Sequence, residues 1–244
     1  MKAIISKIIQ AFKANPAEET AALVNEASQN LKQINQRHIN SGVLMLDPST
    51  VYIDESVKIA PGAVLYPGVI LEGSCEIAAG AVIGPNSHLT DTIVGENANI
   101  KQSVTVGAKI GAGTEVGPFA YLRPGAVVGK KCRVGNFVEI KNANLGDETK
   151  MAHLAYIGDA DVGNGVNIGC GAITVNYDGK AKHRTTIKDN AFVGSNVNLV
   201  APVEVGEGAF VAAGSTITNN VPGDALCIAR ARQVEKLNWG TRKS

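Results

Sequence analysis

The sequence predicts an all-β fold in which the chain winds as a parallel β-helix, and three observations support this prediction. Large apolar residues recur every six residues over most of the chain after residue 51. Glycine often follows such a residue, and a small residue often lies four positions after it. Aromatic residues make up only 5% of the sequence, whereas 27 of its 244 residues are glycine. This composition suits narrow repeated coils better than a layered core built on large rings.

The six-residue period also gives the expected interior positions. Because strand side chains alternate, a hexad forms a short strand and a corner, with its apolar residue pointing inward. Three hexads make a coil of about 18 residues that climbs roughly 4.8 Å. A sandwich of short strands, the alternative, does not hold one phase for so long. The expected interior residues are Ile53, Ile59, Leu65, Leu71, Ile77, Ile83, Leu89, then Val94 and Ile100, then Val104, Ile110, Val116, Leu122, Val128, Val134 and Ile140, and finally Ile187, Val193, Leu199, Val205, Val211 and Ile217.

Three segments are expected: N-terminal helices and a linker over residues 1–42, the β-helix over 43–221, and a C-terminal arm over 222–244. Residues 1–13 have the pattern of a short amphipathic helix. A second helix is expected to begin at Asn15–Pro16 and to end near Arg37, because Asn caps helices and Pro favours their first position. Its apolar stripe consists of Leu23, Ala27, Leu31 and Ile34. The helices are expected to cover one open end of the β-helix, and the arm to cover the other or reach a neighbouring subunit.

Composition narrows the functional classes. A net charge of +1 gives no overall field that would draw nucleic acid or a membrane surface. The sequence contains no apolar run of 18 residues, the length that a membrane-spanning helix needs. The first 13 residues lack the unbroken apolar core of a signal peptide. The four cysteines are far apart and form no C-x-x-C pair, so we expect reduced thiols and a cytoplasmic location.

The most suggestive polar residues lie between Val134 and Lys182, where the six-residue phase breaks after Leu145. Residues 176–186 cannot form a hexad and are expected to protrude as a basic loop; a solvated turn is the alternative. His153 lies roughly one coil after Glu139. A histidine oriented by a carboxylate is a suitable general base near neutral pH, whereas the alternative is an ordinary surface histidine.

Five segments carry a close family resemblance: G-P-F-A-Y-L-R-P-G (117–125), G-N-F-V-E-I-K (135–141), H-L-A-Y-I-G-D-A (153–160), G-A-I-T-V-N-Y-D-G (171–179) and V-A-P-V-x-V-G-x-G-A-x-V-A-A-G-S-T-I-T (200–218). They resemble the C-terminal half of the bifunctional bacterial N-acetylglucosamine-1-phosphate uridyltransferases / glucosamine-1-phosphate acetyltransferases of UDP-N-acetylglucosamine synthesis. The resemblance covers about Arg37 to Arg232. It implies a left-handed β-helix, a homotrimer, and acetyl-CoA-dependent N-acetylation of glucosamine 1-phosphate.

The resemblance also implies roles for individual residues. His153 matches the general base and Glu139 the carboxylate that orients it. The residues that match the sugar-phosphate site are Arg123, Lys141, Tyr156, Asn167 and Lys182. Those that match the acetyl-CoA site are Cys170, Asn176, Tyr177, Ser195, Ala213 and Arg230. We expect direct transfer in a ternary complex, with a backbone N–H near Gly169–Gly171 stabilising the oxyanion and Cys170 as a small wall residue, although its thiol could in principle be acylated.

The chain departs from that family at its N-terminus. The nucleotidyltransferase domain of the full-length enzymes is not in this sequence, so uridylyl transfer and its divalent metal are expected to be absent. Either a separate nucleotidyltransferase chain supplies that activity, or this chain is a fragment or a specialised stand-alone form. Acetyl transfer itself is expected to require no metal. Three alternatives stay open: a non-catalytic β-helix that binds or regulates a partner, an acyltransferase for another amino sugar, and a metal-dependent hydratase of the carbonic anhydrase type. The last needs three histidine ligands, and only His153 and His183 lie near one another in the sequence.

Overall fold

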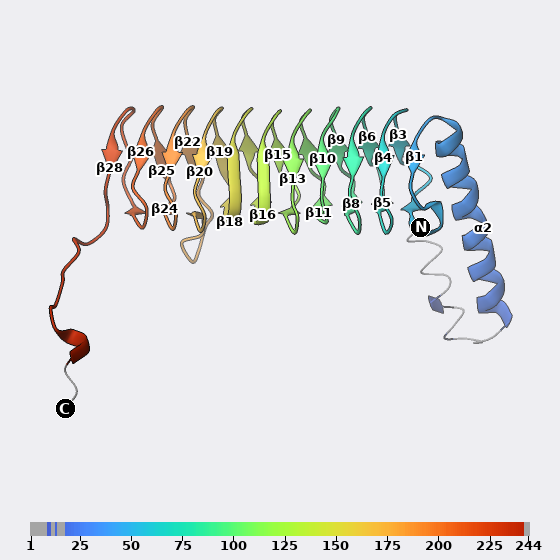
Figure 1. Cartoon of the computed structure of the whole chain (residues 1–244), viewed down its shortest axis with the longest axis horizontal. Helices are drawn as coiled ribbons and strands as arrows, with labels where there is room; N and C mark the ends of the chain where they lie inside the picture. Colours follow the sequence, from blue (N-terminus) through green and yellow to red (C-terminus); the bar gives the residue numbers. More distant parts are fainter. Residues whose placement is uncertain (1–8, 11–12, 14–17, 242–244) are drawn as a thin grey trace.

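The computed structural model describes residues 9–10, 13 and 18–241. It shows a long β-solenoid with the helix α2 (Glu18–Asn40) at its first coil and an extended arm after its last coil (Figure 1). The predicted helix over residues 1–13 and its neighbour Asn15–Pro16 lie almost wholly outside the described residues. The predicted second helix is confirmed, and it ends at Asn40 rather than near Arg37.

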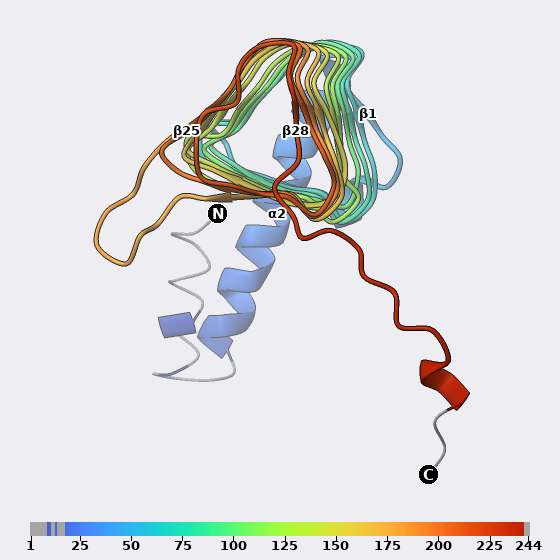
Figure 2. The same cartoon turned by 90° about the vertical axis from the view of Figure 1, so that its left-hand side faces the viewer.

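The solenoid has three faces, which appear as a triangle when it is viewed along its axis (Figure 2). All the strands of these faces pair in parallel. Face 1 consists of β1 (Leu44–Met45), β4 (Val64–Leu65), β7 (Val82–Ile83), β10 (Asn99–Ile100), β13 (Glu115–Val116), β16 (Arg133–Lys141), β18 (Lys150–Gly158), β20 (Asn167–Ile168), β23 (Phe192–Val193), β26 (Phe210–Val211) and β28 (Leu226–Cys227).

The other two faces follow in the same order along each coil. Face 2 consists of β2 (Tyr52–Ile53), β5 (Ile70–Glu72), β8 (His88–Thr90), β11 (Val104–Val106), β14 (Tyr121–Leu122), the second halves of β16 and β18, β21 (Ile173–Val175), β24 (Asn198–Val200) and β27 (Thr216–Ile217). Face 3 is a separate sheet of β3 (Lys58–Ile59), β6 (Glu76–Ile77), β9 (Ile93–Val94), β12 (Lys109–Ile110), β15 (Val127–Val128), β17 (Asn144–Leu145), β19 (Ala160–Val162), β22 (Thr185–Ile187) and β25 (Val203–Val205).

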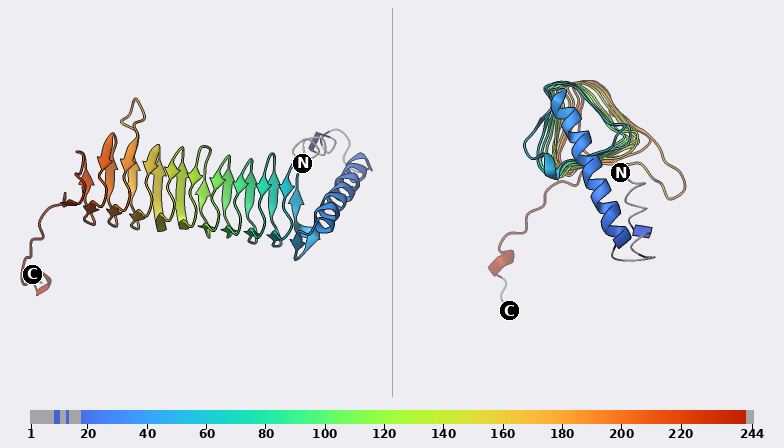
Figure 3. Two further views of the ribbon diagram at one scale, coloured as in Figure 1. Left: turned by 90° about the horizontal axis from the view of Figure 1, so that it is seen from above. Right: turned by 90° about the vertical axis from the view of Figure 1, so that its right-hand side faces the viewer.

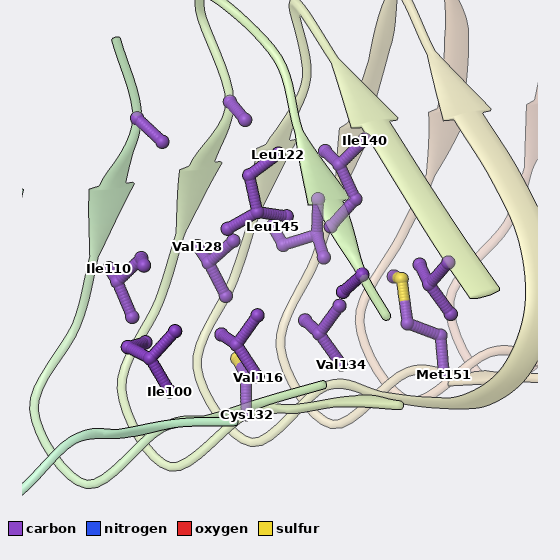
Figure 4. Close-up of a cluster of buried hydrophobic side chains, with 14 of the residues drawn as sticks. Ile100, Ile110, Val116, Leu122, Val128, Cys132, Val134, Ile140, Leu145 and Met151 are labelled. Atoms are coloured by element: carbon purple, nitrogen blue, oxygen red, sulfur yellow. The ribbon is translucent and has the colours of Figure 1, made fainter. Parts of the chain in front are cut away.

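The predicted all-β parallel β-helix is therefore confirmed. Its three-sided coils are consistent with the left-handed coil that the resemblance implies. The interior is a column of aliphatic side chains that point inward from all three faces (Figure 4). Leu122, Ile140 and Ile157, for example, stack on successive coils of face 2 and are almost fully buried. Burying each such side chain contributes about 1.5–3 kcal/mol.

One predicted interior position is wrong. Val104 is exposed, and its neighbour Thr105 takes the interior position between Leu89 and Leu122. The reason is a buried hydroxyl pair: Thr105 Oγ1 lies 2.9 Å from Thr92 Oγ1, and Thr92 Oγ1 donates to the carbonyl of Thr90. A hydroxyl that is paired in this way can be buried at little cost. Thr105 can therefore occupy the interior although it is polar, and its apolar neighbour Val104 points outward.

The expected break of phase after Leu145 is also wrong in part. Met151, Ile157, Val162 and Ile168 continue the interior column, with one interval shortened to five residues. Only residues 176–184 leave the coil, and they form the predicted protruding loop at the corner between faces 2 and 3 (Figure 2). Coils in this region have 17 residues, as the pairing of Asn136 with His153 shows.

The C-terminal part of α2 covers the first coil. Ile34, Asn35 and His38 are buried there, while the rest of the helix leans away from the solenoid (Figure 3). Asn35 Nδ2 donates to the carbonyls of Pro48 and Val51, which flank the short 3₁₀ helix η1 (Pro48–Thr50). The expected cover at this end is therefore present.

The other end of the solenoid lies beyond the expected boundary at residue 221. β28 still pairs in parallel with β26. The arm then runs away from the last coil and ends in a 3₁₀ turn, η2 (Trp239–Thr241) (Figure 1). Val234, Leu237 and Trp239 on this arm are largely exposed. The arm thus does not fold back over the end of its own solenoid.

The buried hydroxyl pair gives a stability prediction. Thr92 uses its only hydroxyl proton for the carbonyl of Thr90, so Thr105 must be the donor to Thr92. Thr92→Val leaves both Thr105 Oγ1 and that carbonyl without a side-chain partner and should cost about 1–3 kcal/mol. Thr105→Val removes only a donor and should cost less than about 1 kcal/mol. Denaturant midpoints of the two variants measure this difference, and the reverse order would contradict the arrangement.

Candidate active site

Strands β16 and β18 shape the candidate site because each continues around the corner between faces 1 and 2. Both are nine residues long, against two or three for the other strands. Phe137 and Leu154 lie at the bend with φ of 57° and 37°, in the left-handed region that bulky residues rarely adopt. The bend directs His153 outward at the corner and Tyr156 outward on face 2.

The partner of His153 is Asn136, which lies opposite it on the preceding coil. His153 Nδ1 is 2.8 Å from Asn136 Oδ1. An amide oxygen accepts a hydrogen bond and does not donate one. Neutral His153 therefore carries its proton on Nδ1, and Nε2 is left with a lone pair that can accept a proton.

The expectation that Glu139 orients His153 is not met within the chain. Glu139 lies opposite Tyr156, not His153. Its carboxylate accepts a hydrogen bond of 2.7 Å from Arg123 Nη1, and this bond raises the pKa of the arginine. The physical reason is register: with 17-residue coils, the residue under His153 is Asn136. Glu139 thus holds Arg123, a predicted sugar-phosphate residue.

Four of the expected site residues stack with Asn136 along one corner of the solenoid. Strand register fixes the stacking on face 1: Met151 pairs with Ile168, Ile168 with Val193, and Val193 with Val211. The pairs on face 2 keep the same offsets between coils. The residues two positions after each face 1 partner therefore lie beside one another at the corner. We call this set the corner column: Asn136, His153, Cys170, Ser195 and Ala213.

The expected oxyanion donor narrows to one group in the corner column. Gly169 N donates 2.8 Å to Val193 O and Gly171 N donates 2.6 Å to Leu154 O, so both belong to the coil ladder. Between them, the N–H of Cys170 has no acceptor within the described residues. A Cβ at Gly169 would lie 2.5 Å from Ser195 N, so only glycine allows these coils to approach so closely.

A cluster of cations lies at the next corner, between faces 2 and 3. The ammonium of Lys182, from the loop, is beside Lys141 at the end of β16 and lowers the pKa of Lys141, with smaller contributions from burial and Arg123. Tyr156 lies along its strand over Gly158, where any side chain would collide with its ring. Fixed cations of this kind suit a phosphate ligand.

The other expected residues lie apart from one another. Asn176 and Tyr177 begin the loop, Asn167 is on face 1, and Arg230 is exposed on the arm. Arg123, Glu139 and Tyr156 occupy face 2, and Lys141 and Lys182 the second corner. One chain therefore assembles the corner column at one corner and the cation cluster at the next. Arg230 lies at the end of the corner column, because its Cδ is 3.7 Å from the position of a Cβ on Gly214, next to Ala213. Asn167 lies apart from both groups.

Metal ligands do not gather in the part of the chain that the structure describes. No group of three or more His, Cys, Asp or Glu side chains there could hold a metal ion. His38 is buried against the first coil, His88 bonds Glu72, and His183 bonds Asp178. No helix among the described residues is long and apolar enough to cross a membrane.

Comparison with known proteins places these residues in context. A family model described as bacterial transferase hexapeptide (six repeats) matches residues 107–142 and 184–219. The chain is 48% identical over 237 residues to the "Bifunctional protein GlmU" of Brevibacillus brevis, an alignment that covers 95% of this chain and 51% of that protein. It is 48% identical over 243 residues to the GlmU of Geobacillus sp. (strain WCH70), covering 97% and 53%.

The chain is GlmU-like and corresponds to the C-terminal hexapeptide half. It spans about half the length of the curated relatives it matches. Among solved structures, a Francisella novicida UDP-N-acetylglucosamine acyltransferase superposes with a TM-score of 0.56 at 19% identity, covering 76% of this chain and 67% of that one. This second likeness concerns the fold alone.

Sequence reasoning missed two polar residues at or near the candidate site. Asn136 could have been found from the coil length, because it precedes His153 by the 17 residues of a local coil. Asp159, which is almost fully buried beside the cation cluster, carried no such signal. Asp159 bonds Asn176 at the start of the loop, and the six-residue repeat contains no information about contacts of the loop.

The orientation of His153 gives a prediction that does not depend on activity. In the wild-type protein at neutral pH, ¹⁵N chemical shifts should show the imidazole proton on Nδ1. Asn136→Leu removes the acceptor and should shift the imidazole toward the Nε2–H tautomer. The matched control Glu139→Gln should leave the tautomer unchanged. The opposite pattern, in which only Glu139→Gln alters it, would contradict the assignment of Asn136.

Proposed function

We propose that this chain transfers the acetyl group of acetyl-CoA to the amine of glucosamine 1-phosphate, forming N-acetylglucosamine 1-phosphate. The observation that carries the proposal is the corner column, in which His153 and the N–H of Cys170 lie on adjacent coils. The similarity to GlmU over 95% of the chain supports the same reaction, since acetyl transfer is what the resemblance implies for that half.

The reaction balances without an acyl-enzyme. The amine nitrogen attacks the thioester carbonyl, the new N–C bond forms, and the C–S bond breaks to release the coenzyme A thiolate. His153 Nε2 accepts the proton that the amine loses, and this proton ends on the thiolate. The N–H of Cys170 stabilises the negative charge on the carbonyl oxygen during the attack. Cys170 itself acts through its backbone, as a small residue of the wall.

The acceptor's phosphate would bind the cations of face 2 and the second corner. Lys141, Lys182 and Arg123 supply fixed positive charge, and Tyr156 and Asn167 contact the sugar. In the chain Arg123, which stays positively charged, forms an ion pair of 2.7 Å with Glu139. Glu139 therefore acts on the acceptor site by fixing the arginine, and any effect it has on His153 is indirect.

Acetyl-CoA would bind along the rest of the corner column and the loop, through Cys170, Ser195, Ala213, Asn176 and Tyr177. Because Asn167 lies on face 1, apart from the corner column and the cation cluster, we propose that the site is completed in a homotrimer. A monomer would then be folded but inactive. The cytoplasmic location stays a prediction from the spaced cysteines.

The proposal is tested by giving the purified protein acetyl-CoA and glucosamine 1-phosphate and measuring thiol release. His153→Ala should lower kcat by about 10²–10⁴-fold, because it removes the general base. Glucosamine without phosphate should be a far weaker substrate. Turnover equal to that of His153→Ala would contradict the proposed function, and equal use of both sugars would contradict the phosphate site.

The charge of Lys141 gives a pH prediction. Because Lys182 lowers the pKa of Lys141, Lys141 loses its cationic form at a lower pH than an isolated lysine, whose pKa is about 10.4. The KM for the phosphate sugar should therefore begin to rise at a lower pH than an isolated lysine would give. Lys182→Gln should raise this KM about tenfold at neutral pH but move the onset of the rise to higher pH. An onset that moves to lower pH would contradict the pairing.

A further inference from the structure

The 176–184 loop is braced internally. The carboxylate of Asp178 accepts hydrogen bonds from Lys180 N at 2.8 Å and Ala181 N at 2.7 Å, and it bonds His183 Nε2 at 2.8 Å. Tyr177 and Lys182 form an antiparallel bridge. Within the described residues, the backbone hydrogen bonds of residues 177–183 stay inside the loop. At the end of the loop, the Arg184 guanidinium binds Asp161 and the carbonyls of Ala160 and Asn142. A unit of this kind moves as one body, so its base sets its orientation.

Asp159 lies at that base and is 6% exposed. Its Oδ2 accepts a hydrogen bond from Asn176 Nδ2, at the start of the loop, and its Oδ1 accepts one of 2.6 Å from Asn142 Nδ2. Its backbone N donates 3.0 Å to Lys141 O, and its carbonyl accepts 3.1 Å from Thr185 N, just after the loop. One residue thus joins both ends of the loop to two coils.

The surroundings of Asp159 also keep its side chain negatively charged. Burial acts to raise the pKa of Asp159, but the hydrogen bonds from Asn142 and Asn176 and the charges of Lys182 and Lys141 outweigh it and hold this pKa below its usual range. The group is therefore a carboxylate at neutral pH, and both amides donate to it. A buried carboxylate that is satisfied in this way fixes the groups around it.

We propose that Asp159 is a positioning residue at the base of the loop, holding Asn176, Tyr177 and Lys182 where the proposed reaction needs them. The effect of Asp159 on the KM values rests on the proposed function, whereas its effect on the position of the loop does not. Asp159 touches neither substrate. It acts through the loop, whereas His153 lies in the corner column, which the loop does not support.

The kinetic test is Asp159→Asn in the full chain. The side-chain amide that this substitution introduces could accept a hydrogen bond from only one of Asn142 and Asn176. Its own NH₂ group would face the Nδ2 donor of the other. KM for acetyl-CoA and for the phosphate sugar should each rise about tenfold, with kcat within about threefold of wild type. The control is Asp189→Asn, which alters a more exposed carboxylate that accepts two hydrogen bonds from Asn164 on the adjacent coil, outside the loop. It should leave both KM values unchanged.

A second readout does not require activity. Trypsin should cut after Lys180, Lys182 or Arg184 about tenfold faster in Asp159→Asn than in wild type, at a similar thermal midpoint. Asn176→Asp should also speed cleavage, because it places two carboxylates in contact. The exchange Asp159→Asn with Asn176→Asp restores one donor and one acceptor, and it should return cleavage close to the wild-type rate.

The outcomes separate the two claims. A loop that stays resistant to trypsin in Asp159→Asn, an exchange variant that is cut as fast as either single variant, or unchanged KM values in an active Asp159→Asn protein would overturn the role of Asp159. Absence of turnover by the wild-type protein would overturn the proposed function, while the trypsin experiment would still decide whether Asp159 holds the loop.

Discussion

The structure depends on the backbone ladder between successive coils, because that ladder decides which side chains lie beside one another. Each coil donates its N–H groups to the previous or next coil at about the strand spacing of 4.8 Å. A coil of 17 residues places Asn136 beside His153, and a coil of 25 residues, with the loop expelled at a corner, places Ser195 beside Cys170. The number of residues in each coil thus determines which side chains meet at the candidate site.

Most of the fold was predictable from the sequence, because the six-residue period is a direct consequence of strand alternation and corners. The failures have specific causes. Thr105 was overlooked because its hydroxyl is paired inside the coil, which composition does not reveal. The role given to Glu139 assumed contact across 14 positions, whereas the actual 17-residue coil selects Asn136. The loop was located, but not its anchor, because Asp159 acts through contacts that only the folded corner brings together.

The corner column and the corner between faces 2 and 3 differ in how firmly their side chains are held. The corner column is built from residues of the ladder itself, so the base and the oxyanion donor are held as firmly as the core. Of the proposed acetyl-CoA residues, Cys170, Ser195 and Ala213 also belong to this column. The other proposed phosphate and acetyl-CoA residues include those of a braced loop, the half-exposed Arg123–Glu139 pair and an exposed arm. Binding in such an arrangement depends on how the adjustable parts are held, and the proposed homotrimer would add contacts from a neighbouring copy of the chain.

The most direct test of this account is whether Ser195 lies beside Cys170, although 25 residues separate them. Adjacent coils place Cα atoms at about the strand spacing, within the range of about 4.4–6.8 Å that a disulfide requires. Ser195→Cys, oxidised mildly and digested, should yield a peptide pair in which Cys170 is cross-linked to the introduced cysteine, as detected by mass spectrometry. Asn190→Cys, at another corner, should give no such pair. A Ser195→Cys protein whose two thiols are both alkylated but never cross-linked would contradict the corner column.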